Sequence, residues 1–207
     1  MTLEASETSA LVPHAEPFDR FAELFARALA LPREWFPEPN TMTVSTVGDD
    51  GQPSSRIVLL KAFDTHGFVF YTNFQGRKGR ELLAHPRTAL CMHWAPLEAQ
   101  VRVEGSAAPV SSEEADAYFA TRARLSQIGA WASSQSDVIA HPGDFERRIA
   151  EVEHEFEGRP VPRPRHWSGF RVVPFRIEFW HNRPNRLHER YVYLRDGAGW
   201  RLVMVYP

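Results

Sequence analysis

Two adjacent cations, Arg77 and Lys78, follow a strand-like segment, Tyr71-Thr72-Asn73, and a glycine, Gly76. A strand followed by a glycine turn, and then by apolar residues at helical spacing, predicts that both cations lie in the first turn of a short helix. The free amides and the dipole at this end of a helix favour an anion, whereas basic side chains normally favour the other end. The pair therefore indicates a phosphate site, with a solvated surface turn as the alternative.

A second pair of cations bounds the apolar run Arg56-Ile57-Val58-Leu59-Leu60-Lys61. Two cations fixed on one strand could hold a phosphate or the carbonyl group of a ring. A core strand whose charged ends reach towards solvent would have the same pattern. This segment alone does not separate the two interpretations.

A third cluster combines a phenol, a guanidinium and a hydroxyl. Tyr118 and Arg122 are four residues apart in a predicted helix, so they share one helix face. Ser126 follows, and Gln135 and Ser136 lie further along the same polar stretch. The first three side chains suit a second phosphate. A capped helix followed by an ordinary polar loop is the alternative.

The fourth cluster is the alternating triplet Arg186, His188 and Arg190, which follows Trp180. On a strand, the three side chains would project from one face. Two guanidiniums with an imidazole between them repel unless an anion or an electron-rich ring lies against them, so the triplet favours a ligand site over a structural role. Trp180 suits stacking on a planar cofactor, and packing in the core is its alternative.

The elements that must position these clusters are mostly strands. Alternating apolar residues between turn signals predict strands over 41–47, 56–63, 68–73, 88–94, 100–107, 170–180, 190–194 and 200–206. Helical spacing predicts helices over 18–29, 77–84, 111–122 and 144–156. Short strands at this spacing favour a mainly β fold, an antiparallel closed or split β-barrel with peripheral helices.

Composition narrows the functional classes. The 207 residues carry a net charge of −2, which argues against a general nucleic-acid coat. Cys91 is the only cysteine, so an intrachain disulfide and a cysteine-rich metal site are excluded, and we expect no metal. No apolar run reaches the roughly 20 residues that span a bilayer. We expect a soluble cytoplasmic protein, with residues 1–15 as a flexible tail and residues 16–207 as a single domain.

From about Pro39 to the C-terminus, the sequence resembles the pyridoxamine/pyridoxine 5′-phosphate oxidase family. Each motif is weak alone, but their order and spacing together are specific. The motifs are Arg56 to Lys61, Tyr71-Thr72, Arg77-Lys78, Ser126 to Trp131, Gln135-Ser136, Glu178-Phe179-Trp180 and Arg186-Leu187-His188. The resemblance implies an FMN-binding split barrel that works as a homodimer, with each flavin at the subunit interface.

The resemblance also implies which residues touch each ligand. The FMN contacts would come from Arg56, Ile57, Val58, Leu59, Leu60, Lys61, Tyr71, Thr72, Arg77, Lys78, Gln100, Gln135, Ser136, Trp180 and Arg190. The substrate contacts would come from Lys61, Tyr118, Arg122, Ser126, Arg186 and His188. Arg186 and His188 are the candidate catalytic residues, acting by positioning the substrate and not by covalent catalysis.

In the family reaction, a hydride moves from the substrate C4′ to the flavin N5. Oxygen then reoxidises the flavin and gives hydrogen peroxide, and the amine substrate also releases ammonia. One alternative is a related split-barrel oxidase of the phenazine-biosynthesis type, and another is a non-catalytic FMN- or heme-binding module. The set of Tyr118, Arg122 and Ser126 favours a phosphorylated substrate and therefore the first function.

Three positions depart from the family pattern. The family places an Arg-x-x-Tyr element over its substrate, but residues 1–15 contain neither arginine nor tyrosine. The usual glutamine after the Phe-Trp pair is His181, and the usual Arg-Leu-x-Pro ending is Met204-Val205-Tyr206-Pro207. We therefore expect another segment to close the site, or the site to be more open to solvent.

Overall fold

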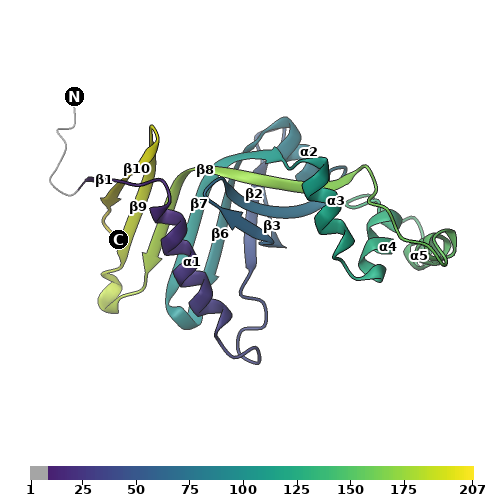
Figure 1. The fold of residues 1–207 in the computed structure, drawn as a ribbon, viewed down its shortest axis with the longest axis horizontal. Helices are drawn as coiled ribbons and strands as arrows, with labels where there is room; N and C mark the ends of the chain where they lie inside the picture. The colour runs from purple at the N-terminus through teal and green to yellow at the C-terminus, as the bar shows by residue number, and fades with distance from the viewer. Residues whose placement is uncertain (1–8) are drawn as a thin grey trace.

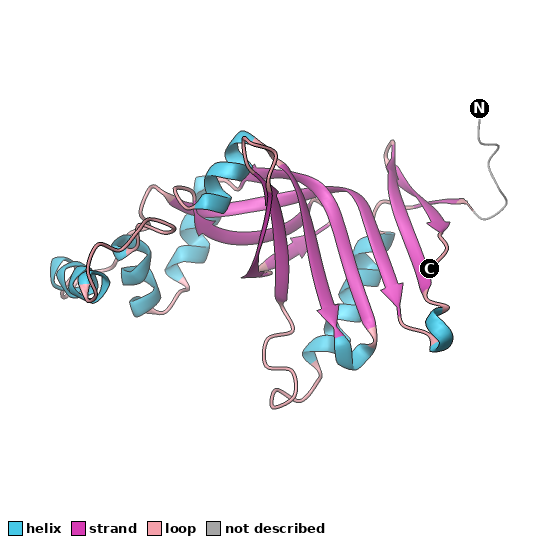
Figure 2. Ribbon diagram, turned by 180° about the vertical axis from the view of Figure 1, so that it is seen from behind, coloured by secondary structure: helices cyan, strands magenta, loops and turns pink. Residues whose placement is uncertain are grey.

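The computed structural model describes residues 9–207, whose strands form one antiparallel sheet. The order in the sheet is β1-β10-β9-β8-β7-β6-β2-β3, with β5 pairing with both β8 and β4. The strands are β1 (Ala10–Val12), β2 (Thr41–Val47), β3 (Pro53–Leu59), β4 (Ala62–Asp64), β5 (Gly67–Asn73), β6 (Arg87–Trp94), β7 (Ala99–Pro109), β8 (Trp167–His181), β9 (Glu189–Asp196) and β10 (Gly199–Met204). The sheet curls into a barrel with helices outside it (Figures 1 and 2), as the sequence predicts.

The barrel closes where one predicted strand, residues 56–63, is in fact two. Leu60 N–H donates to Asn40 O (2.8 Å) beside β2, whereas the next amide, Lys61 N–H, donates to Val69 O (2.9 Å) on β5. The chain therefore changes partner between consecutive residues, and β3 becomes β4. This corner places Lys61 at the seam between the two halves of the barrel.

The split in the barrel lies along β8, the longest strand. Its first half pairs with β5 and its second half with β9, while β7 follows its other edge. Pro174 lies where the partner of β8 changes from β5 to β9, and proline has no N–H to donate to a neighbouring strand. Opposite it is Gly105, where a Cβ atom would lie 2.5 Å from Val173 O, so only glycine allows β7 and β8 this close.

Helix α1 (Glu16–Leu29) fills one side of the barrel with an apolar face. Phe18, Phe21, Leu24 and Ala28 recur at helical spacing and are buried against the strands. Phe21 packs edge-on against Phe68 at a centroid distance of 5.0 Å. The predicted helix over 18–29 is therefore confirmed, and its apolar stripe belongs to the barrel core.

A second apolar cluster lies under the remaining helices, away from α1 (Figure 1). These helices are α3 (Ser112–Ala120), α4 (Arg124–Ala132) and α5 (Asp144–Glu155), and α2 (Arg77–Ala84) follows β5. Two single turns, η1 (Ala95–Leu97) and η2 (Pro184–Arg186), complete the elements. The cluster ends on Trp167, the first residue of β8. The helices are thereby anchored to the barrel.

The N-terminal prediction needs a correction. Ala10–Val12 form β1 and pair with β10, and Trp200 Nε1–H donates to His14 O (3.1 Å). The pairing of β1 with β10 and the hydrogen bond from Trp200 therefore hold residues 10–14 in place. The sequence had assigned these residues to a flexible tail ending at residue 15. Residues 1–8 lie outside the described residues, so the tail stays a prediction for them.

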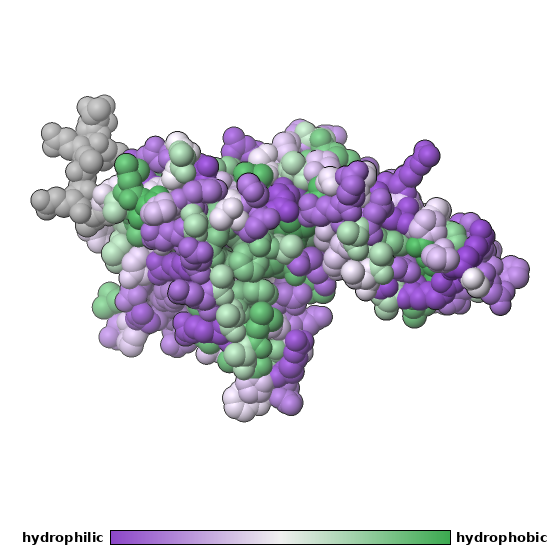
Figure 3. Space-filling view, in the orientation of Figure 1, coloured by the Kyte–Doolittle hydropathy of each residue, from purple (hydrophilic) through white to green (hydrophobic). Residues whose placement is uncertain are grey.

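The surface seen in Figure 3 is hydrophilic over most of its area, with apolar surface gathered in a band down the middle of this face. Within residues 9–207, no helix is both long and apolar enough to cross a membrane. The cytoplasmic location stays a prediction.

Candidate functional site

A cleft of about 510 Å³ lies where β3, β5, α2, α3 and α4 approach the start of β8. It gathers residues from the first three sequence clusters, although they are far apart in the chain. Its walls are formed by Ile57, Val58, Leu59, Lys61, Tyr71, Thr72, Lys78, Tyr118, Arg122, Ala123, Ser126, Gln135 and Trp167. The predicted cofactor residues of β3 and β5 and the predicted substrate residues of α3 and α4 therefore share one cavity.

The floor of the cleft includes the start of α2, which has no side-chain cap. Lys78 Nζ donates to Thr72 Oγ1 (2.9 Å) and Gln135 Oε1 (2.7 Å), and the backbone amide of Arg77 donates to Ser136 Oγ (3.1 Å). Burial, and then the charge of Arg56, lower the pKa of Lys78. The predicted cations therefore do lie at the start of a helix. A bound anion would stabilise the protonated form of Lys78.

Arg56 is held by groups of the protein itself. Its guanidinium donates to Val44 O (3.2 Å), Ser54 Oγ (2.8 Å) and Glu81 Oε2 (3.3 Å). Sequence reasoning missed Glu81, a buried carboxylate that also accepts from Arg77 Nε. The signal that could have revealed it is its position four residues after Arg77, where a carboxylate meets a cation on one helix face.

Stacked aromatic rings form the opposite wall of the cleft. Tyr71 stacks on Tyr118 at a centroid distance of 3.9 Å and on Trp167 at 5.4 Å. Burial, with the nearby Glu114 and Tyr118, raises the pKa of Tyr71 to about 12, so its phenol stays protonated. Sequence reasoning also missed Trp167, because nothing local distinguishes it from a core tryptophan. A planar ligand ring would find a flat, apolar surface here.

Arg122 brings an unsatisfied cation to the cleft. Its guanidinium carbon lies 4.6 Å from the centroid of the Trp167 ring. Its Nη1 atom is buried and has no hydrogen-bond partner among residues 9–207. Burial lowers the pKa of Arg122. Because a buried charged donor without a partner costs free energy, an anion beside this guanidinium, which lines the cleft, would stabilise it.

The third cluster is built differently from its prediction. Helix α3 begins as expected, because Ser111 Oγ accepts from the amide of Glu114 (3.1 Å), but it ends at Ala120. Arg122 therefore lies in a turn between two helices, and Ser126 lies in the first turn of α4 and not in a polar loop. Helix α4 has no side-chain N-cap and so lacks the usual start signal in the sequence.

A second set of predicted residues lies across the end of the sheet, and we call it the C-terminal strip. Gln100, Trp180 and Arg190 are direct neighbours on β7, β8 and β9, so they project from one face. Together with Arg186 and His188, which follow in the connection from β8 to β9, they complete this strip. The ring of His188 lies 4.7 Å from that of Trp180.

Two residues of the strip do not have the predicted backbone. Arg186 ends the single turn η2 and has a φ of 62°, and His188 precedes β9, which begins at Glu189. The expected alternation on one strand is therefore wrong, because Pro184 starts a turn that interrupts the β8–β9 connection. Arg186 is exposed, and His188 Nδ1 accepts from the amide of Arg183 (3.3 Å).

The cleft and the strip lie on different sides of the barrel. In Figure 1, strand β9, which carries Arg190, lies on the left and helices α3 and α4 lie on the right, with other strands of the barrel between them. Trp180 in the strip lies 13 positions after Trp167 in the cleft along β8, which corresponds to about 40 Å in a fully extended strand. We infer that one mononucleotide does not contact both regions of the same subunit.

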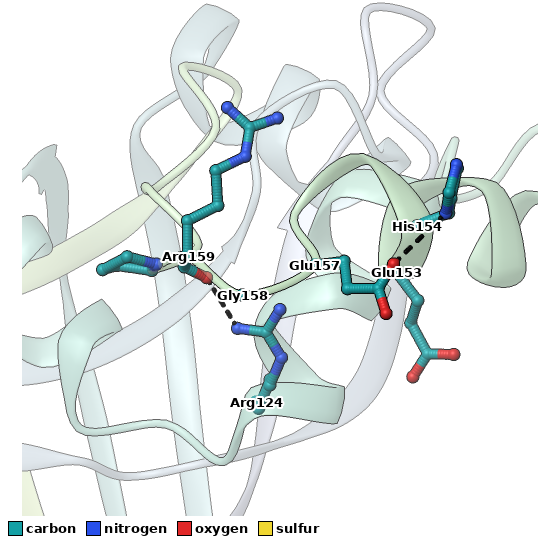
Figure 4. A pocket seen from close by; sticks show the side chains of 7 residues that line it. Arg124, Glu153, His154, Glu157, Gly158 and Arg159 are labelled. Carbon is teal, nitrogen blue, oxygen red and sulfur yellow. Dashed lines mark hydrogen bonds and ion pairs between the residues drawn. The ribbon is translucent and has the colours of Figure 1, made fainter.

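A larger hollow of about 790 Å³ lies beside α5 (Figure 4). Its cation, Arg124, donates to the carbonyl oxygens of Arg159 (2.9 Å) and Phe156 (2.7 Å). His154 Nδ1 lies 3.5 Å from Glu157 Oε2 on its exposed rim. These groups satisfy one another, so the hollow offers a ligand less than the cleft does.

Comparison with known proteins identifies the family. Residues 32–156 match the family described as pyridoxamine 5′-phosphate oxidase. A pyridoxine/pyridoxamine 5′-phosphate oxidase of Myxococcus xanthus is 60% identical over 93% of this chain and 92% of its own length. One from Rubrobacter xylanophilus is 56% identical over 93% of this chain and 87% of its own length. The chain belongs to the pyridoxine/pyridoxamine 5′-phosphate oxidase family. The predicted family and enzyme class are confirmed.

Solved structures of the oxidase family's relatives confirm the predicted fold. PhzG from Burkholderia lata, in complex with tetrahydrophenazine-1-carboxylic acid, has a TM-score of 0.85 and 28% identity over 96% of this chain and 98% of its own. A pyridoxamine 5′-phosphate oxidase-related, FMN-binding protein of Nostoc punctiforme has a TM-score of 0.71 and 15% identity over 91% of this chain and 96% of its own. Residues 167–207, which contain most of the strip, match the family's C-terminal dimerisation region.

Proposed function

We propose that this oxidase oxidises pyridoxamine 5′-phosphate and pyridoxine 5′-phosphate to pyridoxal 5′-phosphate, with FMN as cofactor, O₂ as electron acceptor and H₂O₂ as product. The amine substrate also consumes water and releases ammonia. One observation supports this proposal most: a single cleft carries two separate places for an anion. They are the Lys78 end of α2 and the guanidinium of Arg122, whose Nη1 has no partner among residues 9–207. A phosphorylated cofactor and a phosphorylated substrate require two such places.

The residues at the start of α2 fit the phosphate of FMN. Arg77 and Lys78 supply two cations, and the free amides of the first turn supply donors. Thr72 and Gln135 hold Lys78 in place, while Arg56 adds a fixed charge nearby. Bound FMN would supply the hydride-accepting redox chemistry, for which side chains have no equivalent group.

The other half of the cleft fits the phosphorylated substrate. Arg122 would bind its phosphate, with the hydroxyls of Tyr118 and Ser126 as further donors and Lys61 at the barrel corner. The stack of Tyr71, Tyr118 and Trp167 would limit the water that reaches the rings. Holding the reacting carbon against the cofactor lowers the barrier by removing the entropy cost of the encounter.

We further infer a homodimer in which each cleft is completed by the C-terminal strip of the partner subunit. The strip is too far from its own cleft to share a ligand with it, and residues 167–207 match a dimerisation region. Gln100, Trp180 and Arg190 of the partner subunit would then contact FMN. Arg186 and His188 of the partner subunit would position the substrate, which makes them the candidate catalytic residues.

The second candidate function is a phenazine-type oxidation. It is favoured by the similarity to PhzG, whose bound tetrahydrophenazine-1-carboxylic acid contains no phosphate. The carboxylate of such a ligand could also pair with Arg122, so Arg122 alone does not separate the two functions. The hydroxyls of Tyr118 and Ser126, which line the cleft with Arg122, add donors that suit the larger number of acceptor oxygens of a phosphate. A non-catalytic FMN- or heme-binding module would require no such substrate residues.

The decisive test is peroxide release with pyridoxamine 5′-phosphate after the protein has been loaded with FMN. We expect one equivalent of pyridoxal 5′-phosphate per H₂O₂, and we expect denatured protein to release FMN. Faster turnover of a dihydrophenazine carboxylate would support the second candidate. Release of FAD, or flavin binding without turnover of any substrate, would contradict the proposed function.

A further inference from the structure

A buried carboxylate connects the two arginines beside α2. Glu81 is only 8% exposed. Its Oε1 accepts from Arg77 Nε (2.8 Å), and its Oε2 accepts from Arg56 Nη2 (3.3 Å) and from Thr46 Oγ1. Arg77 lies one turn earlier on the same helix, whereas Arg56 and Thr46 come from β3 and β2. One side chain thus fixes cations that belong to different elements.

The atom through which Arg77 is held matters. Glu81 binds Nε, and the terminal nitrogens of Arg77 form no hydrogen bond among residues 9–207. The side chain of Arg77 is 55% exposed, so without this contact it would move among many rotamers. Because Glu81 holds Arg77 through Nε, the two terminal nitrogens stay free to bind a phosphate as a fork. Part of the conformational entropy of the side chain is then already lost before the ligand binds.

We propose that Glu81 is a positioning residue for the phosphate of the cofactor, acting through Arg77 and Arg56. This inference rests on the proposed function, because it takes the start of α2 as the FMN phosphate site. Glu81 does not touch the phosphate in this role. It sets the direction of one guanidinium and anchors the other, so its effect appears only with a flavin that carries a phosphate.

Glu81 also has an opposing electrostatic effect. Burial would raise the pKa of Glu81, but hydrogen bonds from Thr46 and Arg77 and the charges of both arginines lower it, so the carboxylate is ionised at neutral pH. A negative charge near a phosphate repels it. Positioning therefore predicts weaker FMN binding when Glu81 is shortened or neutralised, whereas simple repulsion predicts tighter binding.

Two variants separate these effects. Glu81→Asp keeps the charge but is one methylene shorter, so it cannot reach both arginines. Glu81→Gln keeps the length but loses the charge and presents a donor to one guanidinium. The matched control is Asp49→Asn, which removes a carboxylate that pairs with His85 at the other end of α2 (2.8 Å).

The measurement is the Kd of the apoprotein for FMN and for riboflavin, which lacks the phosphate, by quenching of flavin fluorescence. For both Glu81 variants we expect the FMN Kd to rise by about tenfold or more, the scale of a charge-assisted hydrogen bond. The riboflavin Kd should stay within about twofold, because no phosphate is present to be positioned. Asp49→Asn should change neither value.

Several outcomes would overturn the inference. An unchanged or tighter FMN Kd would mean that Glu81 acts only as a nearby charge. Equal weakening for FMN and riboflavin would mean that Glu81 only supports the fold. In an Arg77→Ala background only the contact with Arg56 remains, so Glu81→Asp should alter the FMN Kd by less than in the wild-type background. A full tenfold effect there would contradict action through Arg77. Wild-type protein without a preference for FMN over riboflavin would contradict the phosphate site itself and so the proposed function.

If Glu81→Gln fails to fold, Glu81→Asp carries the test, since it retains the charge that Arg56 and Arg77 require. The circular dichroism and thermal midpoint of each apoprotein establish which variants are folded.

Discussion

The cleft and the C-terminal strip both arrange arginines around a buried carboxylate, but they leave different charges unpaired. Next to the strip, Glu178 is 1% exposed and accepts hydrogen bonds from Arg102, Arg176 and the strip residue Arg190. Next to the cleft, Glu81 accepts hydrogen bonds from only two arginines, Arg56 and Arg77. Lys78 and the Nη1 atom of Arg122 are then left with neutral partners or with none in the described chain.

This difference teaches how to tell an architectural network from a ligand site. Burial would raise the pKa of Glu178, but hydrogen bonds from its three arginines lower it to about 2, so the carboxylate is held in its ionised form. In the cleft, burial lowers the pKa of both Lys78 and Arg122. A negative ligand would stabilise the protonated form of both groups.

The largest expected effect concerns the network under the strip. Glu178→Gln should lower the free energy of unfolding by about 3 kcal/mol at pH 7, because it leaves three arginines without their buried counter-charge. The measurement is urea unfolding of the apoprotein. A loss below about 1 kcal/mol would show that the network is no more than a set of surface pairs.

The same variant predicts a pH dependence. The pKa of Glu178 is lowered to about 2 in the folded protein, compared with about 4.3 in an unfolded chain. Its contribution to stability is therefore complete above about pH 5 and is lost as the pH falls towards 2. The difference in unfolding free energy between wild type and Glu178→Gln should shrink over that range. A difference in unfolding free energy that stays constant over this pH range would contradict the conclusion that Glu178 is an ionised carboxylate paired with its arginines.

The next prediction tests whether the two regions meet across subunits. Arg122→Ala in the cleft and Arg186→Leu in the strip should each lower kcat/KM by about a hundredfold, with flavin content near that of wild type. Loss of flavin in parallel would mean that the residue serves the cofactor and not the substrate.

Mixing the two inactive variants sharpens this result. In a symmetric dimer whose cleft is completed by the partner, a hybrid has one intact site and one doubly altered site. Equal random mixing should then restore about a quarter of the wild-type activity. No recovery from co-expressed, tagged and purified hybrids would place both residues in the site of one subunit.

A smaller effect is expected at the start of α2. Arg77→Ala should weaken FMN binding by about 1.5–3 kcal/mol, the value of a charge-assisted hydrogen bond. Flavin titration of the apoprotein measures it, with Lys78→Ala as a companion variant and Arg147→Ala on α5 as a control remote from the cleft. An unchanged affinity would remove Arg77 from the phosphate site.

The smallest effect is expected at the N-terminus. Removing residues 1–8, which contain neither arginine nor tyrosine, should change kcat/KM by less than about fivefold at saturating FMN. Removing residues 1–15 should in addition lower the thermal midpoint, because it deletes β1 and the contact of His14 with Trp200. A hundredfold loss with the shorter deletion and with flavin retained would reveal a lid of unusual composition.

The sequence by itself determined the local features of the site. The strand, glycine and helix around Arg77, the capped start of α3 at Ser111 and the apolar stripe of α1 depend on contacts within a few residues, so their patterns can be read directly. Such local elements depend on backbone hydrogen bonding and periodicity, which act over short sequence distances. The spaced motifs led separately, through the resemblance, to the family and to predicted cofactor and substrate residues, several of which line the cleft.

Only the tertiary structure decided which side chains meet. Trp167 reaches the cleft because β8 begins there, and Glu81 meets Arg56 because α2 packs beside β2 and β3. The turn at Pro184 placed Arg186 outside a strand, although its alternation with His188 matched one. Such contacts join residues that are distant in the chain, and packing and charge pairing select them after the local elements have formed, so no local pattern specifies them.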